Sequence, residues 1–333
     1  MKRLSIALLA ALCAAGCASD ACIKAARLNV GSYNIRLQTK ERDPENSWDN
    51  RKKDFVDFIA KLDLDILGLQ EVCPGQADYI TNSLPQYALL GAHRNDGKRK
   101  GEASPVMYRK DRFAILDSGT FWLSETPDVP GSKSWQTACP RVCTWAILKD
   151  AVSGKSLCFA NTHTDHISEL ARKEGMLLVI RRMRKFSKPG TPLIFTGDHN
   201  CRETEEPAIA VSKMLRNAIN VSETPPTGPW RTFNGWHWRE GEMPASDALK
   251  LSPEVRNVET GSPDKSAEDR QAVANEICGP RIDYIYVSDE IKVKSYSTHS
   301  DSRPGRNLYP SDHFPVTAVV ELLEIPPVTP IHI

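Results

Sequence analysis

The sequence predicts an α/β fold in which two mixed, mainly antiparallel sheets pack together and carry helices on their outer faces. Apolar runs of strand length outnumber the segments with helical spacing. Many strands with few helices between them favour two packed sheets. The chain has 333 residues, enough to bury a large core. It has 40% hydrophobic and 26% charged residues, which is ordinary for a globular domain.

Four segments are expected to form helices. Residues 47–63 place apolar side chains near helical spacing, and residues 74–85 are typical of a helix that begins at a proline. Residues 167–187 combine an apolar stripe with a basic end, which suits the negative C-terminal end of the helix dipole. A fourth helix is expected near residues 205–215.

The remaining apolar runs are expected to form strands. The three between residues 87 and 124 are expected to pair sequentially and antiparallel, and the turn sequence AVSG predicts a hairpin at 143–166. Residues 217–279 are mostly polar and poorly periodic. The expected strands cover residues 27–36, 64–72, 87–94, 104–110, 113–124, 143–150, 156–166, 192–200, 281–288, 291–299 and 314–325.

The N-terminus predicts export. Residues 1–16 have a basic start and a short apolar run, as signal peptides do, and "LCAAGC" resembles a bacterial lipobox that ends at Cys17. We therefore expect lipid on Cys17, a linker at 17–26, one domain at 27–325 and a tail at 326–333. The expected location is the bacterial cell envelope, in the outer membrane or periplasm, with membrane contact only through Cys17. A plain secretory signal and a secreted protein are the alternative.

Charge and cysteine content limit the partners. The full chain has a net charge of +1, and removal of Lys2 and Arg3 with the signal makes the mature charge negative, so no strong nucleic-acid-binding surface is evident. Of nine cysteines, an odd number would remain unlipidated in the exported domain, and their pairing cannot be deduced from spacing. We expect a monomer.

Polar groups gather where the predicted strands start or end. Carboxylates and amides without cysteine suit a hard cation such as Mg²⁺ or Mn²⁺, while an Asp–His pair such as Asp283 with His313 suits proton transfer. Together these groups are what phosphoryl transfer requires. They lie in the motifs SYNIR (Asn34), LQEV (Glu71), NTHTDH (Asn161, His163, Asp165, His166), GDHN (Asp198, Asn200), RIDYIY (Asp283) and SDHFPV (Asp312, His313).

These six motifs, in this order, resemble the endonuclease/exonuclease/phosphatase superfamily, also called DNase I-like, in its bacterial secreted or lipoprotein branch. The resemblance implies a four-layer α/β/β/α sandwich and divalent-metal-dependent phosphoester hydrolysis. It implies Glu71 as the main metal ligand, with Asn34 and Asp312 close to the metal. The catalytic residues that it implies are His163, Asp198, Asn200, Asp283 and His313.

Substrate contacts are expected from a second set of residues. Arg141 and Tyr108 fall near the family's phosphate-binding Arg and Tyr, and Asn161 belongs to the NTHTDH motif. His166 is either a further contact or a loop residue, and Trp236 is either an aromatic rim or part of a packed loop. One departure from the family pattern is His199, where the family usually has an apolar residue, and we expect it to be a packed or surface residue rather than a ligand.

The sequence therefore predicts a metal-dependent phosphoester hydrolase, with a phosphodiesterase favoured. The substrate stays open among nucleic acid, phospholipid and sugar or inositol phosphate. A catalytically inactive protein that binds through the same cleft is the alternative. A metal-dependent hydrolase of another bond, such as an ester or a glycoside, is disfavoured because no GxSxG motif occurs and the carboxylates accompany a His and two Asn.

Overall fold

The computed structural model describes residues 27–236, 280–303 and 308–323. The predicted signal peptide, the linker and the tail lie outside the described residues, as does most of the polar segment 217–279. No helix within the described ranges is long and apolar enough to cross a bilayer. The domain limits at 27 and 325 stay a prediction.

The described strands form two six-stranded sheets. The first has the order β11-β12-β1-β2-β4-β3 and the second has the order β5-β6-β7-β8-β10-β9. In the described sheets β1 runs parallel to β2 and β7 parallel to β8, and the other neighbours are antiparallel. The strands are β1 (Arg27–Asn34), β2 (Ile66–Gln70), β3 (Tyr87–Leu90), β4 (Val106–Arg109), β5 (Phe113–Trp122), β6 (Val142–Asp150), β7 (Ser156–His163), β8 (Leu193–Asp198), β9 (Arg216–Asn217), β10 (Asp283–Val287), β11 (Ile291–Thr298) and β12 (Val316–Leu322).

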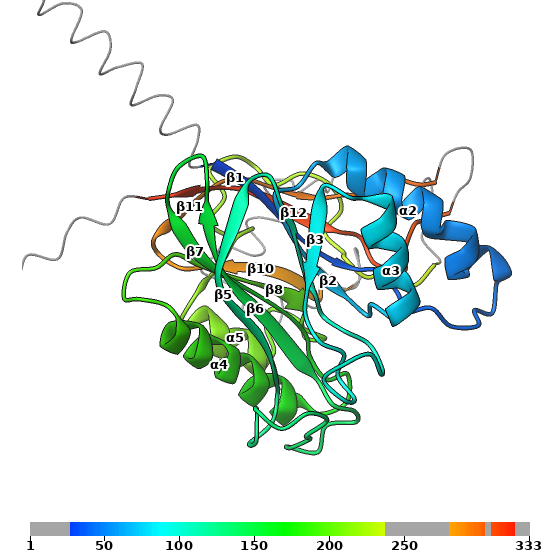
Figure 1. Ribbon diagram of the computed structural model, residues 1–333, viewed down its shortest axis with the longest axis horizontal. Helices are drawn as coiled ribbons and strands as arrows, with labels where there is room; N and C mark the ends of the chain where they lie inside the picture. The colour runs from blue at the N-terminus through cyan, green and yellow to red at the C-terminus, as the bar shows by residue number, and fades with distance from the viewer. Residues whose placement is uncertain (1–26, 237–279, 304–307, 324–333) are drawn as a thin grey trace, which may run out of the picture.

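Helices cover the outer face of each sheet (Figure 1). One apolar cluster joins α2 (Trp48–Leu62) and α3 (Pro74–Ser83) to the first sheet, and a short 3-10 helix, η1 (Pro44–Asn46), precedes α2. A second cluster joins α4 (Glu169–Phe186) and α5 (Glu206–Ser212) to the second sheet. A third cluster fills the space between the two sheets. The predicted α/β/β/α sandwich of two mixed, mainly antiparallel sheets is therefore confirmed.

The strands between residues 87 and 124 are the main correction. The sequence predicts that all three pair in order, but only β3 and β4 do, while β5 pairs with β6 in the second sheet. The chain therefore passes from the first sheet to the second between β4 and β5. Tyr108 from β4 and Phe113 from β5 both belong to the apolar cluster between the sheets.

The two parallel pairs explain where polar residues gather. β1 and β2 end together, since Asn34 lies in register with Gln70, the residue before Glu71. β7 and β8 also end together, with His163 in register with Asp198. Asn34 Nδ2 donates a hydrogen bond of 2.9 Å to Asp198 Oδ2 and so joins the strand ends of one sheet to those of the other. The fold thus brings strand ends distant in sequence to one edge of the sandwich.

Candidate active site

A cavity of about 380 Å³ lies where β1, β2, β7 and β8 end. Strand ends on a packed scaffold are rigid positions from which loops and side chains can form a site. The cavity therefore collects most of the residues that the sequence singles out. Those that line it are Glu71, Arg141, His163, His166, Asp198, Asn200, Asp312 and His313.

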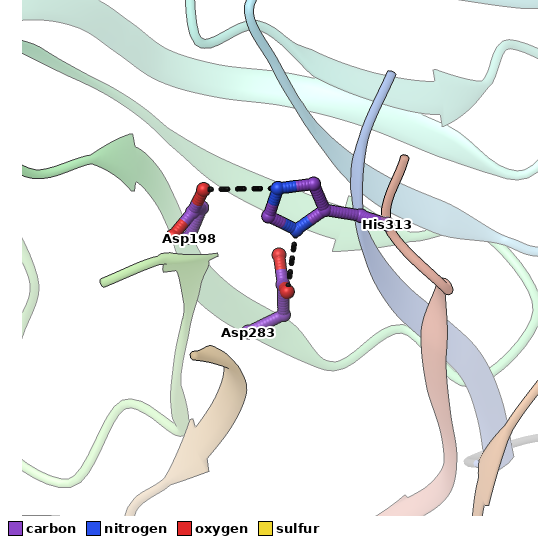
Figure 2. A group of neighbouring side chains, drawn as sticks. All are labelled: Asp198, Asp283 and His313. Atoms are coloured by element: carbon purple, nitrogen blue, oxygen red, sulfur yellow. Dashed lines mark hydrogen bonds and ion pairs between the residues drawn. The ribbon is translucent and has the colours of Figure 1, made fainter. Parts of the chain in front are cut away.

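The ring of His313 lies between two buried carboxylates (Figure 2). Its Nδ1 is 2.8 Å from Asp283 Oδ2, and its Nε2 is 3.7 Å from Asp198 Oδ2. The first residue of β10, Asp283, pairs in register with the last residue of β8, Asp198. Backbone pairing therefore sets the separation of the two carboxylates, and Asp283 fixes the orientation of the imidazole.

Charges in this trio perturb one another strongly. Burial lowers the pKa of His313, but the carboxylates of Asp283, Asp198 and Asp312 outweigh burial and raise that pKa to about 10. Burial raises the pKa of Asp198 to about 7, and the charge of Asp283 adds to this effect. Near neutral pH, His313 is thus a cation and Asp198 can take up or release a proton.

Glu71 and Asp312 are the carboxylates that fit a hard cation. Glu71 has a left-handed backbone, with φ 63°, and its Oε2 accepts a bond of 2.9 Å from the Leu37 amide. Burial raises the pKa of Asp312, and the negative charge of Glu71 raises it further. A divalent cation relieves such repulsion, and carboxylate oxygens are the ligands that Mg²⁺ and Mn²⁺ prefer. Because His313 already pairs with Asp198 and Asp283 as a cation, that trio suits a metal less well, although its ligand atoms lie within 4.8 Å of one another.

Asn34 holds the two sides of the site together. Its Nδ2 donates to Glu71 Oε1 at 3.0 Å and to Asp198 Oδ2 at 2.9 Å. Its Oδ1 accepts a bond of 3.0 Å from the Arg36 amide. In this structure the predicted metal neighbour Asn34 therefore acts as a positioner of two carboxylates, with its own oxygen engaged by the backbone.

His163 and Asn200 form the neighbouring wall. Asn200 Nδ2 is 2.9 Å from His163 Nε2, and the Asn200 amide donates to Asp198 Oδ1 at 3.0 Å. Burial lowers the pKa of His163 well below its ordinary value, and the positive charge of Arg141 lowers it further. His163 is therefore neutral, while His313, in the same cavity, is charged.

Arg141 supplies a guanidinium for an anion. Its side chain is 5% exposed and lines the cavity. Nη2 is 3.0 Å from His166 Nδ1, whereas Nε and Nη1 have no hydrogen-bond partner among the described residues. The nearest carboxylate oxygen, Asp165 Oδ1, is 3.8 Å from Nε. Buried unpaired donors beside a cavity suit a bound phosphate oxygen.

The other predicted substrate contacts lie away from the cavity. Tyr108 packs in the apolar cluster between the sheets, because its strand turns that side chain inward. Asn161 is fully buried under the site, where Nδ2 donates to the Leu69 and Pro105 carbonyls at 2.7 and 3.0 Å. Trp236 packs on Arg51, with 5.6 Å between the guanidinium carbon and the ring centre. The structure thus gives these three residues packing and positioning roles.

His199 is packed, as the sequence predicts. Its ring is fully buried and lies 4.7 Å from the ring of Phe195 and 5.6 and 5.7 Å from those of Tyr284 and Tyr286. Its side chain therefore points into the helix-covered core and leaves the neighbouring Asp198 to face the cavity.

Sequence patterns missed seven residues of the cavity wall: Arg36, Leu37, Arg94, Glu102, Cys139, Phe233 and Ile282. Arg36 is the last residue of the SYNIR motif and could have been found from it. Arg94 ends the predicted strand 87–94, but β3 stops at Leu90, so Arg94 and Glu102 both lie in an excursion between β3 and β4. Phe233 packs edge-on against His313 with ring centres 5.1 Å apart.

Comparison with known proteins agrees with this geometry. Residues 31–313 match the model of the Endonuclease/Exonuclease/phosphatase family. A Bacteroides thetaiotaomicron protein of that family is 32% identical, with a TM-score of 0.73 over 90% of this chain and 98% of that one. A mannosyl-6-phosphatase from the same organism is 32% identical, with a TM-score of 0.71 over 88% of this chain and 99% of that one.

A curated relative is more distant. An uncharacterized protein of Acanthamoeba polyphaga mimivirus is 24% identical over 206 residues, which is 51% of this chain and 30% of that protein. The family match and the solved structures carry the assignment. The chain belongs to the endonuclease/exonuclease/phosphatase family, whose members are phosphoesterases.

Proposed function

We propose that the protein is a divalent-metal-dependent hydrolase of small phosphomonoesters. The observation that carries this proposal is the polarity of one cavity, whose wall combines the carboxylates of Glu71 and Asp312 with a charged His313 and with Arg141 donors that have no hydrogen-bond partner among the described residues. The sequence alone favours a diester. However, the buried guanidinium of Arg141 and the imidazolium of His313, both on the cavity wall, suit the dianion of a monoester better. The 32% identity to a mannosyl-6-phosphatase also supports a monoester.

The residues of the site have separable tasks in this reaction. Glu71 and Asp312 would hold the cation, which when bound offsets charge on the phosphate oxygens. Asp198, with a pKa of about 7, accepts the proton of the attacking water, and Asn200 and Asn34 hold its two oxygens in place.

The two histidines and Arg141 complete the mechanism. The imidazolium of His313 donates to Asp283 through Nδ1 and presents Nε2 toward the cavity, where it stabilises developing negative charge. Arg141 binds the phosphate. Neutral His163 accepts a hydrogen bond from Asn200 Nδ2 through Nε2 and so holds that amide at the cavity wall.

Paired substrates test the proposal. Purified protein with Mg²⁺ or Mn²⁺ is expected to cleave p-nitrophenyl phosphate at least about tenfold more efficiently than bis-p-nitrophenyl phosphate. Arg141→Gln should raise KM for the monoester, while Arg109→Gln, at an ion pair outside the cavity, should not. A preference for the diester would instead support the phosphodiesterase activity that the sequence favours. Absence of any turnover, with retained binding of inorganic phosphate, would support the inactive binding protein.

We also propose that the mature protein is tethered to the cell envelope through lipid on Cys17. The support is the sequence "LCAAGC" after a basic and apolar leader. Acylation of one cysteine by several chains would anchor the domain without a membrane-spanning helix.

A further inference from the structure

Arg94 and Glu102 form a doubly bonded ion pair on the wall of the cavity. Arg94 Nη2 is 2.6 Å from Glu102 Oε1, and Arg94 Nη1 donates to Glu102 Oε2 at 2.9 Å. The two side chains are 17% and 15% exposed, and both line the cavity. The hydrolytic steps described above use neither residue. Because taking such a pair out of water is costly, its place beside a substrate cavity calls for a role.

The loop that carries the pair is well braced. The Arg94 amide donates to the Glu102 carbonyl at 2.8 Å, and Trp122 Nε1 donates to the Arg94 carbonyl at 2.6 Å. Ala103 then pairs with Val72, the residue after Glu71, through backbone bonds of 2.8 and 3.1 Å. The ion pair is therefore fixed close to the carboxylate that fits the metal. A recognition element needs this kind of support.

The pair retains hydrogen-bonding capacity. Each carboxylate oxygen has a lone pair left after it binds one guanidinium nitrogen, and Arg94 Nε has no partner among the described residues. A hydroxyl group can donate to the carboxylate and accept from the guanidinium at the same time. Two adjacent hydroxyls match this planar array of donors and acceptors.

An apolar surface on the same cavity completes the subsite. Phe233 lines the cavity, is 37% exposed and pairs through its backbone with His313. A partly exposed ring on a cavity wall can cover the C–H face of a sugar. Arg99, on the same loop as Arg94, is not part of this subsite, because it pairs with Asp78 outside the cavity.

We propose that Arg94 and Glu102, with Phe233, form a leaving-group subsite for vicinal hydroxyls, so that the substrates are monophosphates of sugars or similar polyols. This inference rests on the proposed phosphatase function. It adds the class of the alcohol and the residues that select it.

The test compares a hydroxyl-rich ester with one that lacks hydroxyls. Glu102→Gln and Arg94→Gln are expected to raise KM for mannose 6-phosphate about tenfold or more, with a smaller change in kcat. Their kcat/KM for p-nitrophenyl phosphate should fall by less than about threefold. Arg99→Gln, on the same loop but outside the cavity, is the matched control and should leave KM and kcat unchanged for both substrates.

A charge-swapped double variant separates recognition from structure. Arg94→Glu combined with Glu102→Arg keeps an ion pair, so thermal unfolding should stay near that of the wild type, yet the high KM for mannose 6-phosphate should persist. Equal losses of kcat/KM for both substrates in the single variants would show that the pair is structural and would overturn the subsite. Recovery of a low KM for mannose 6-phosphate in the swapped variant would do the same. If the wild-type protein cleaves neither ester, the proposed phosphatase function is contradicted. If it cleaves both esters and these variants have no effect on either, only the proposed subsite is contradicted.

Discussion

Gln70 Nε2 donates to Asn161 Oδ1 at 2.7 Å and thereby joins β2 of one sheet to β7 of the other. Thr196 Oγ1 donates to the same oxygen at 3.2 Å, from β8. The three strands that carry Glu71, His163 and Asp198 are thus linked through one buried amide. Gly68 leaves room for it, since a Cβ there would lie 2.4 Å from Asn161 Oδ1.

Asn161→Ala should therefore destabilise the fold by about 3 kcal/mol, because it removes the buried hydrogen bonds to the Leu69 and Pro105 carbonyls and from Gln70 Nε2 and leaves a cavity in the core. Urea unfolding measures this change. The matched control is Asn50→Ala, which removes one exposed bond to the Pro44 carbonyl and should cost less than about 1 kcal/mol. Equal losses in the two variants would remove Asn161 from its linking role.

Glu71→Gln should weaken Mn²⁺ binding by about tenfold or more, since a neutral amide replaces the main anionic ligand. Isothermal titration calorimetry measures the binding directly. Hydrolysis should fall by about 10²-fold or more, and EDTA should abolish it in the wild type until Mg²⁺ or Mn²⁺ is restored. Glu125→Gln, at an exposed residue, is the control. Full activity in chelator would exclude the metal role.

His199 should contribute to acid sensitivity. Burial lowers the pKa of His199 to about 3 from its ordinary value of 6.5, so the unfolded chain binds a proton that the folded chain excludes. Stability from the neutral ring is thus complete above pH 6.5 and is lost as pH falls toward 3.

Replacement of the ring tests this effect. His199→Phe keeps an aromatic ring in the stack and should gain about 2 kcal/mol relative to the wild type when the pH drops from 7.5 to 5.0. Urea unfolding at both values gives the difference. If the free energy of unfolding of the variant differs from that of the wild type by the same amount at both pH values, packing alone accounts for the difference.

Cys17→Ala should release the protein from the membrane fraction, because no lipid can then be attached. Fractionation and immunoblotting of the bacterial host would show the protein in the soluble fraction. Cys22→Ala is the control and should leave it with the membranes. A membrane-associated Cys17→Ala protein would contradict the lipid anchor.

Much of the fold could be predicted because its signals are local. α2 and the strands around Asn34 and Asp198 show helical spacing or apolar runs, and each lies where the sequence places it. The partner of β5 could not be predicted, because apolar alternation does not say whether two strands share an edge or a face.

The site, too, could be predicted only where its residues lie in local sequence motifs. Glu71, Asp198 and His313 stand at strand ends within recognisable motifs, and the structure brings them to one cavity. Arg94 and Glu102 have no such signal, since their meeting depends on how one loop folds back. The place of Tyr108 between the sheets could not be predicted, because neighbouring residues on a strand point to opposite faces and motif proximity does not determine which face.

The bond from Asn34 to Asp198 crosses from one sheet to the other, and so does the His313–Asp283 pair. A folding intermediate with only one sheet assembled would have half of the constellation and no catalysis. Recovery of turnover during refolding should consequently lag behind recovery of secondary structure. Catalytic activity would then report the docking step that completes the molecule.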